Sequence, residues 1–262
     1  MAVNPTNTSN YLSRSSDLPS LATVTICGWF RTPASLPSYS YGGALVDHST
    51  NYGLYIVLYQ DGTHPYSGAQ EYSASGEQHC DFAAGTATNT WYFYAVVRSG
   101  NAVSGGLRCY RAGISESLLT AAISGSTPTA TTPTRLSLGN DFWGDDGPSR
   151  VAALKIWSGV ALTAAEIEAE RWFYTPVRTT DLHLWSPFND QDDSNFRDYS
   201  GNGRHWTETG TVAQSGIDGP PISWAPARRQ RFWIPAASPP VRGGLILGGR
   251  TLAGLTLGGL LR

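Results

Sequence analysis

Three aspartates in one short stretch are the residues best suited to bind a metal ion. Asp190, Asp192 and Asp193 lie in "NDQDDSNF" (189–196), and closely spaced carboxylate oxygens are the ligands that Ca²⁺ takes in proteins. No glycine turn and distal glutamate follow in the spacing of an EF-hand. The stretch therefore has two interpretations, a Ca²⁺ site or a solvated turn, and the sequence indicates no other cofactor.

A second group of residues could bind a carbohydrate. Sugars need exposed aromatic faces with polar groups beside them, and five aromatic residues fall in stretches typical of loops: Tyr39, Tyr41, Tyr66, Tyr72 and Trp143. Trp143, which lies between two aspartates, is the strongest candidate. The alternative is that each ring packs against its own loop and holds it. Tryptophans in strand-like runs are instead expected in the core: Trp29, Trp91, Trp157 and Trp185.

Composition narrows the class of protein that must position these side chains. The chain has 262 residues, of which only 15% are charged, and it carries 29 Gly, 9 Trp and 13 Tyr. Low charge with many glycine and aromatic residues favours a β protein rich in turns. The net charge of −2 provides no field to attract nucleic acid or an anionic membrane. We therefore expect no nucleic-acid partner.

The start of the chain and the cysteines give little information about function. "MAVNPTNTSNYLSRSS" (1–16) has neither a basic region nor an apolar region, so either a signal peptide was removed or the protein takes another route. Cys27 and Cys109 lie in strand-like runs, as buried free thiols or as a disulfide. Cys80 would be left over from that pair. Its neighbours His79 and Asp81 form no metal-binding spacing.

Short runs of β-branched and aromatic residues, bounded by Gly, Pro, Asn, Asp or Ser, recur along the chain. They predict strands at 23–31, 42–47, 53–62, 91–98, 106–113, 134–139 and 150–159. In "TVTICGWFR" (23–31), apolar residues at even positions alternate with Thr25, Cys27 and Trp29. Many short strands of this kind predict an all-β, antiparallel β-sandwich of the jelly-roll type.

The run at 150–159 predicts a strand with both faces largely covered, because both alternating sets contain apolar residues. One set is Ala152, Leu154 and Ile156, and the other is Val151, Ala153, Lys155 and Trp157.

One helix is expected directly after this strand, near 163–174. Thr163 and Glu166 have the spacing of a capping box, in which each side chain bonds a backbone N–H at the helix start. Ile167 and Trp172, with Leu162 before the cap, give the helix one apolar side. We expect this helix to pack on the edge or end of the sandwich.

The final stretch, "GGLILGGRTLAGLTLGGLLR" (243–262), contains a ten-residue unit twice, so that Leu245 and Leu247 recur as Leu255 and Leu257. Alternating leucines between Gly-Gly pairs predict two short strands with flexible turns. Exposed apolar strands need a partner surface, so we expect the tail to dock by strand addition, on its own domain or on a neighbouring chain. A membrane span is disfavoured, since Arg250 near the midplane would cost about 2.5–3.5 kcal/mol.

Three segments of the chain resemble the laminin-G-like (concanavalin-A-like) jelly-roll domains of bacterial and phage proteins. They are "YLSRSSDLPSLATVTICGWFRT" (11–32), "VAALKIWSGVALTAAEIEAE" (151–170) and "LHLWSPFNDQDDSNFRDYSGNGRHWTETGT" (182–211). In many members the last segment comes first, so the strand order stays open. The resemblance covers roughly residues 8–224 and implies a jelly-roll domain, which we place at 1–224. We expect a Pro- and Arg-rich linker at 225–242 and the tail at 243–262 to follow it.

Catalysis is not expected. Glycosidases with this sandwich carry two carboxylates facing one groove, within a Glu-x-Asp-x-x-Glu strand pattern, and the chain has no such pattern. It also has no Gly-x-Ser-x-Gly elbow, phosphate-binding loop or His-rich metal motif.

Two functions remain after catalysis is set aside. The first is a structural or decoration subunit of a virion or extracellular surface layer, joined to its assembly by the tail. The second is a carbohydrate-binding module.

Overall fold

The computed structural model of the chain describes most of the residues up to Trp224 and two short pieces of the tail. The described residues are 2–5, 9–35, 39–47, 49–50, 52–60, 67–82, 85–100, 106–125, 128–139, 147–148, 150–188, 196–215, 219–224, 246–247 and 250–251.

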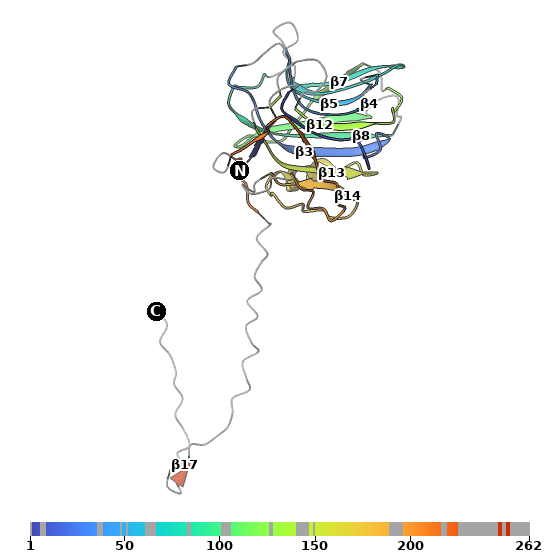
Figure 1. The fold of residues 1–262 in the computed structure, drawn as a ribbon. Helices are drawn as coiled ribbons and strands as arrows, with labels where there is room; N and C mark the ends of the chain where they lie inside the picture. Colours follow the sequence, from blue (N-terminus) through green and yellow to red (C-terminus); the bar gives the residue numbers. More distant parts are fainter. Residues whose placement is uncertain are drawn as a thin grey trace. The chain divides into compact units, whose positions relative to one another are not determined.

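Two antiparallel sheets, each of eight described strands, form a sandwich (Figure 1). Sheet 1 has the order β10 (Leu119–Thr120), β9 (Leu107–Gly113), β8 (Trp91–Ser99), β3 (Thr23–Arg31), β13 (Arg150–Ser158), β1 (Ala2–Asn4) and β16 (Ala213–Ser215), and β14 (Leu182–Ser186) also pairs with β13. Sheet 2 has the order β11 (Ala122–Gly125), β7 (Gly76–Phe82), β6 (Ser67–Ser73), β5 (Tyr52–Gln60), β4 (Tyr39–Asp47), β12 (Arg135–Leu138), β2 (Tyr11–Arg14) and β15 (Thr207–Thr209).

The predicted all-β sandwich is confirmed, and each of the seven predicted strands overlaps a strand of the structure. The alternation in residues 23–31 is also confirmed. Val24, Ile26 and Phe30 belong to the core between the sheets, which they share with Leu54 and Leu136 of sheet 2. Burial of these apolar side chains between the sheets is the main favourable contribution to folding.

Sheet 1 is covered on its second face as well, which explains why β3, β8 and β13 are apolar at almost every position. Cys27, Trp29, Phe93 and Trp157 point away from sheet 2 into a separate buried cluster that includes Ile167. Strands buried on both faces read as continuous apolar runs rather than as alternating ones. Cys27 therefore lies on the opposite face of sheet 1 from Cys109, which belongs to the inner core.

The helix α1 (Ala164–Arg171) supplies much of this outer cover, with the Thr163–Glu166 capping box in place. The expectation that it packs on an edge or end of the sandwich was wrong: Leu162 and Ile167 contact the outer face of sheet 1. Trp172 does not join the apolar side either. It is 37% exposed, and its indole N–H donates to Glu168.

A β-bulge changes the faces of β13 from those predicted. The pairing of β13 with β3 shifts register between Ala152 and Lys155, and Ala153 has a φ of 53°. Such a bulge inserts one extra residue and reverses the alternation beyond it. Val151 therefore shares the inner core with Leu154, whereas the strict period placed it on the other face with Lys155.

Lys155 and Glu170 form a buried ion pair between β13 and the end of α1. The Lys155 Nζ lies 2.8 Å from Glu170 Oε2, and both side chains are only 1% exposed. The ammonium also donates to the carbonyl oxygens of Glu170 and Phe173. The carboxylate accepts the backbone N–H groups of Val177 and Arg178. Both charged groups thus make hydrogen bonds besides their mutual contact. The pair joins the helix, and the chain after it, to sheet 1.

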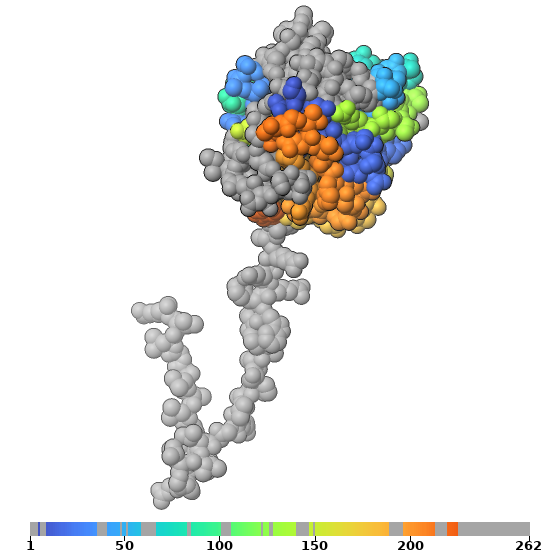
Figure 2. Space-filling view, in the orientation of Figure 1, coloured from blue at the N-terminus to red at the C-terminus, as the bar shows by residue number. Residues whose placement is uncertain are grey.

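The third resembling segment supplies the late strands and settles the strand order. Its first part forms β14 beside β13, and its end forms β15 beside β2. Figure 2 shows residues of this segment, in orange, against the N-terminal strands, in blue. The late segment thus takes part in both sheets, although it follows the helix in sequence.

The chain divides into two compact units, Met1–Pro226 and Ala227–Arg262. Within the second unit, β17 (Ile246–Leu247) pairs antiparallel with β18 (Arg250–Thr251). Among the described residues, no helix is long and apolar enough to cross a membrane.

Thr163→Ala should lower the free energy of unfolding by about 0.5–2 kcal/mol, because one N–H of the first helical turn loses its acceptor. The change is measured as a shift of the urea midpoint. Thr163→Ser keeps the hydroxyl and is the matched control. Equal midpoints for the alanine and serine variants would mean that packing alone holds the helix start.

Glu170→Gln should destabilise the protein by about 3–5 kcal/mol, because it leaves the buried Lys155 ammonium without a counter-charge. The double variant Lys155→Met, Glu170→Gln should recover part of this loss, since no unpaired charge remains. Urea unfolding of both single variants and the double variant forms the test. Strictly additive losses would contradict the coupling of the two groups.

Candidate functional site

One row of side chains crosses the whole outer face of sheet 2, the face that points away from sheet 1. The strand registers align Thr207, Ser13, Ser137, Ala44, Tyr55, Gln70, His79 and Ser124 on β15, β2, β12, β4, β5, β6, β7 and β11. Side chains of directly opposed residues point to the same face. The half of the row that begins at β5 carries larger polar and aromatic side chains.

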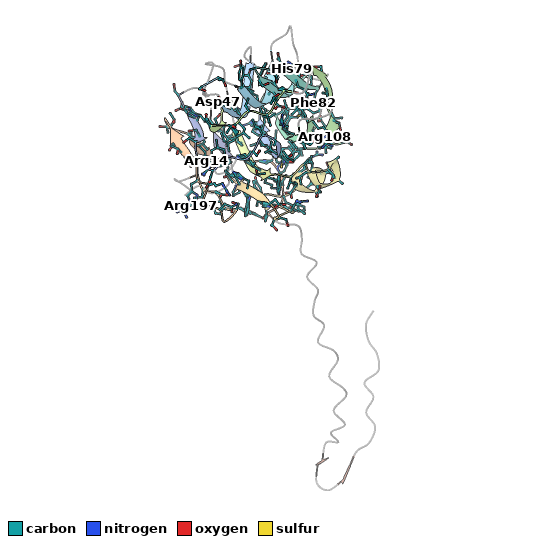
Figure 3. All side chains as sticks on the ribbon, turned by 90° about the vertical axis from the view of Figure 1, so that its right-hand side faces the viewer. Arg14, Asp47, His79, Phe82, Arg108 and Arg197 are labelled. Atoms are coloured by element: carbon teal, nitrogen blue, oxygen red, sulfur yellow. The ribbon has the colours of Figure 1, made fainter. Side chains whose placement is uncertain are left out.

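Four aromatic rings from neighbouring strands contact one another across this half of the face. Ring centroids are 5.7 Å apart between Tyr41 and Tyr55, 5.9 Å between Tyr55 and Tyr72, and 6.1 Å between Tyr72 and His79. We call these residues the aromatic row. Tyr55 is 1% exposed, but the His79 side chain is 25% exposed, and Figure 3 shows His79 at the margin of the domain. The row thus runs from a buried base to an open end.

Polar groups accompany the open end. The Tyr72 hydroxyl donates to Gln70 Oε1 at 3.0 Å, and His79 Nε2 contacts the half-exposed Glu77 carboxylate. Burial, with a smaller contribution from the Glu77 charge, raises the pKa of Tyr72 well above its ordinary value. Tyr72 therefore stays a neutral hydrogen-bond donor. Ring faces beside a carboxylate, an amide and an imidazole form an amphipathic surface.

Two of the five predicted aromatic residues come together here, but their surroundings differ from those expected. Tyr41 and Tyr72 lie on β4 and β6, not in loops, and Tyr41 is buried. Tyr39 also lies on β4. The strand predicted to begin at Gly42 begins at Tyr39 instead, and Tyr72 lies on a strand that was not predicted. Tyr66 and Trp143 lie outside the described residues, and their role stays a prediction.

The predicted Ca²⁺ ligands and most of the tail also lie outside the described residues: Asp190, Asp192, Asp193, Leu245, Leu255 and Leu257. Leu247 lies on β17. Within the described part of the chain, no group of three or more His, Cys, Asp or Glu side chains could hold a metal ion.

Sequence reasoning missed Tyr55, Gln70, Glu77 and His79. Tyr55 could have been found from the sequence. It lies on a predicted strand, at one of the alternate positions that point to the outer face. The strands that carry the other three residues were not predicted, since "SGAQEYSASGEQHCDF" (67–82) is polar and rich in glycine and serine. Pairing of β6 with β5 and of β7 with β6 brings these residues onto one face.

The carboxylates of this face are placed unlike a glycosidase pair. Glu77 and Asp81 lie on one strand, four residues apart, and the rise per residue puts their Cα atoms about 13 Å from each other. Glu71 points inward instead, where Arg98 Nε lies 2.5 Å from its Oε1. Burial raises the pKa of Glu71, and the Arg98 charge opposes that effect.

Arg98 also supports a groove of about 510 Å³ between residues 15–22 and 130–133. Its guanidinium donates to the carbonyl oxygens of Ala22, Gly100 and Pro128. The groove is lined by hydroxyl groups and short apolar side chains, with Asp17 its one charged residue among those described. It contains none of the predicted site residues.

Asp198 is the centre of the turn in the third resembling segment. Its two carboxylate oxygens accept the N–H groups of Trp185, Ser200 and Arg204 and the hydroxyl of Ser200, at 2.8–3.0 Å. Burial alone would raise the pKa of Asp198, but these hydrogen bonds outweigh it and hold the pKa below the ordinary value. The Asp198 carboxylate makes these hydrogen bonds within the domain and so holds the turn against β14.

Residues 5–168 match the family model of the concanavalin A-like lectin/glucanases superfamily. The match covers more than half of the 262 residues, so the chain belongs to this family. No curated protein matches it in sequence.

Solved structures with a similar fold come from different sources. A Bacteroides ovatus protein, to which carbohydrate binding has been attributed, has a TM-score of 0.55 and 15% identity, over 84% of this chain and 60% of its own length. The heptameric pentraxin of Limulus polyphemus gives 0.46 and 13%, over 78% and 87%. The enzymatically active domain of tailspike protein 2 from bacteriophage CBA120 gives 0.43 and 12%, over 65% and 27%. At these identities the likeness is one of fold.

Asp198→Asn should destabilise the protein at neutral pH and progressively less in acid. A carboxylate whose pKa is lowered by folding adds stability above its unfolded pKa, which is about 3.9, and this stability is lost as the pH falls through the folded pKa. Urea midpoints of wild type and variant should therefore converge below about pH 4. Asp181→Asn, at an exposed carboxyl, is the matched control. A constant difference down to pH 2 would mean that the Asp198 charge does not hold the turn.

Proposed function

We propose that the jelly-roll domain is a non-catalytic carbohydrate-binding module that binds glycans at the open end of the aromatic row. The observation that carries this proposal is the chain of ring contacts from Tyr41 through Tyr55 and Tyr72 to His79 across four strands, buried at Tyr41 and Tyr55 and partly exposed at Tyr72 and His79. Membership of a superfamily that includes lectins supports the same ligand class.

The chemistry of this surface suits a sugar. The C–H face of a pyranose stacks on aromatic rings, and its hydroxyl groups need acceptors and donors at the rim of that contact. Glu77 and His79 present such groups beside Tyr72. The rings beneath them are held by strands, so binding costs little ordering of the surface.

The absence of catalysis is part of the proposal and rests on the position of the carboxylates. Retaining glycosidases need two carboxyl groups about 5–5.5 Å apart, and inverting ones about 6.5–9.5 Å. Among the described residues of the outer face, Glu77 and Asp81 stand four residues apart on one strand, and the inward Glu71 is paired with Arg98.

A second candidate function is that of a structural or decoration subunit of a virion or extracellular surface layer. The observation that favours it is the antiparallel pair of β17 and β18 in the unit Ala227–Arg262. Two strands of two residues each are too short to be stable alone. The repeated leucine pattern on either side of them is therefore suited to docking on a protein surface. The two functions are compatible in one chain.

Tyr72→Ala and His79→Ala should each weaken binding of the best ligand on a glycan array by about tenfold or more, equivalent to about 1.4 kcal/mol. Tyr72→Phe keeps the ring and should retain most of the affinity. Tyr199→Ala, at an exposed tyrosine near β14, is the matched control. Titration calorimetry with the ligand found on the array gives the numbers.

Two outcomes would contradict the proposal. Unchanged affinity in both alanine variants would place the binding site elsewhere. Release of reducing ends from the bound glycan, lost in Glu77→Gln or Asp81→Asn, would show an enzyme.

A further inference from the structure

Residues 117–126 run along one side of the sandwich, and their sequence lacks the charges and prolines that usually protect an edge. Residues 119–125 form β10 at the end of sheet 1 and then β11 at the end of sheet 2. Ala121, between them, is buried, and its N–H donates to Cys109 of β9. Both sheets therefore end on one short piece of chain. Among the described strands, β11 pairs with β7 alone.

Edge strands normally carry charges, prolines or bulges, because their free backbone groups would otherwise pair with another strand. The stretch "SLLTAAISGS" (117–126) contains no charged residue and no proline. Leu119 and Ile123 are 43% and 42% exposed, and Ser124 and Gly125 are exposed as well. At the opposite end of sheet 2, β15 is shorter and carries Glu208.

The C-terminal tail has the matching properties. Leu245 and Leu247, and again Leu255 and Leu257, recur with period two, and residues 251–261 contain no charge. A strand with one apolar row and no charge can add to an apolar, uncharged edge without burying an unpaired ion. The pair of β17 and β18 already shows that part of the tail takes the extended, antiparallel pairing that such an edge offers.

We propose that the β11 edge receives the Gly/Leu-rich segment 243–262 of a second copy of this chain. The inference rests on the proposed assembly role, which requires a contact between chains, and it names the surface that makes this contact. Exchange of tails between two copies gives a closed, two-fold contact in which each copy donates one tail and accepts the other. An added strand would extend sheet 2 beside Ser124, which lies opposite His79 on β7.

The test uses the full chain, Ile123→Lys, Leu119→Lys, a truncation that lacks 241–262, and Thr207→Lys as the control at the opposite, exposed edge. Light scattering with size exclusion gives the mass of each protein over a range of concentrations. The full chain and Thr207→Lys should self-associate, and the truncation should be monomeric. Ile123→Lys should weaken self-association at least tenfold. A cooperative thermal unfolding transition shows that the variants are folded. Leu119→Lys, on β10 at the edge of sheet 1, should retain self-association.

A mixing experiment separates exchange between chains from docking within one chain. The truncated protein keeps an intact edge and the Ile123→Lys protein keeps an intact tail, so the two should form a one-to-one complex. If the two proteins form no complex, and hydrogen exchange of β11 is slowed in a monomeric full chain, the tail docks within its own chain. That result would overturn the proposal. Undiminished self-association of Ile123→Lys would overturn the β11 edge but leave the assembly role standing. A monomeric full chain with β11 unprotected from exchange would overturn both.

Discussion

A lysine ammonium can remain charged beneath a helix only if a carboxylate and further acceptors surround it, and the Lys155–Glu170 pair meets this condition. The pair joins β13, the central strand that contacts β3, β1 and β14, to the end of α1. Through the N–H groups of Val177 and Arg178 it also fixes the chain that leaves the helix. The outer cover of sheet 1 depends on this contact, and so does the path of the segment that continues to β14.

Other buried cationic side chains also join separate segments of the chain, at the ends of the sandwich. Arg98 holds three carbonyl oxygens from separate loops, and Arg171 holds those of Gly113 and Glu116 in the turn after β9. Arg14 reaches His205 in the late segment. A guanidinium has five donors in a fixed plane, so one side chain can satisfy several carbonyl groups that lack strand partners. A chain with few charges thus places several of them inside, where they connect loops.

Sequence patterns predicted the fold well wherever the environment of a residue is set by its own strand. The run at 23–31 was predicted as a strand because apolar, β-branched and aromatic residues fill both of its buried faces, and the Thr163–Glu166 box is local by nature. The patterns failed where a distant partner decides. Val151 changed faces because a bulge at Ala153 follows from pairing with β3 and from the bond of its N–H to Pro187. The polar strands β6 and β7 were not predicted, because their inner groups include Glu71, whose charge is paired with Arg98 of the other sheet.

The position of the candidate site follows from a difference between the outer faces of the two sheets. Sheet 1 is covered on its outer face by α1 and the chain that follows, so its side chains there serve packing. Sheet 2 has no helix over its outer face among the described residues, and the exposure of Tyr72, His79 and Glu77 shows that part of it reaches solvent. A face that need not be apolar can carry an imidazole, an amide and a carboxylate beside its rings. The inner face of sheet 2 belongs to the main core, and its outer face carries a smaller buried cluster around Tyr55 and Val57. Recognition can therefore develop at the partly exposed end of that outer face, around Tyr72 and His79, without cost to the core.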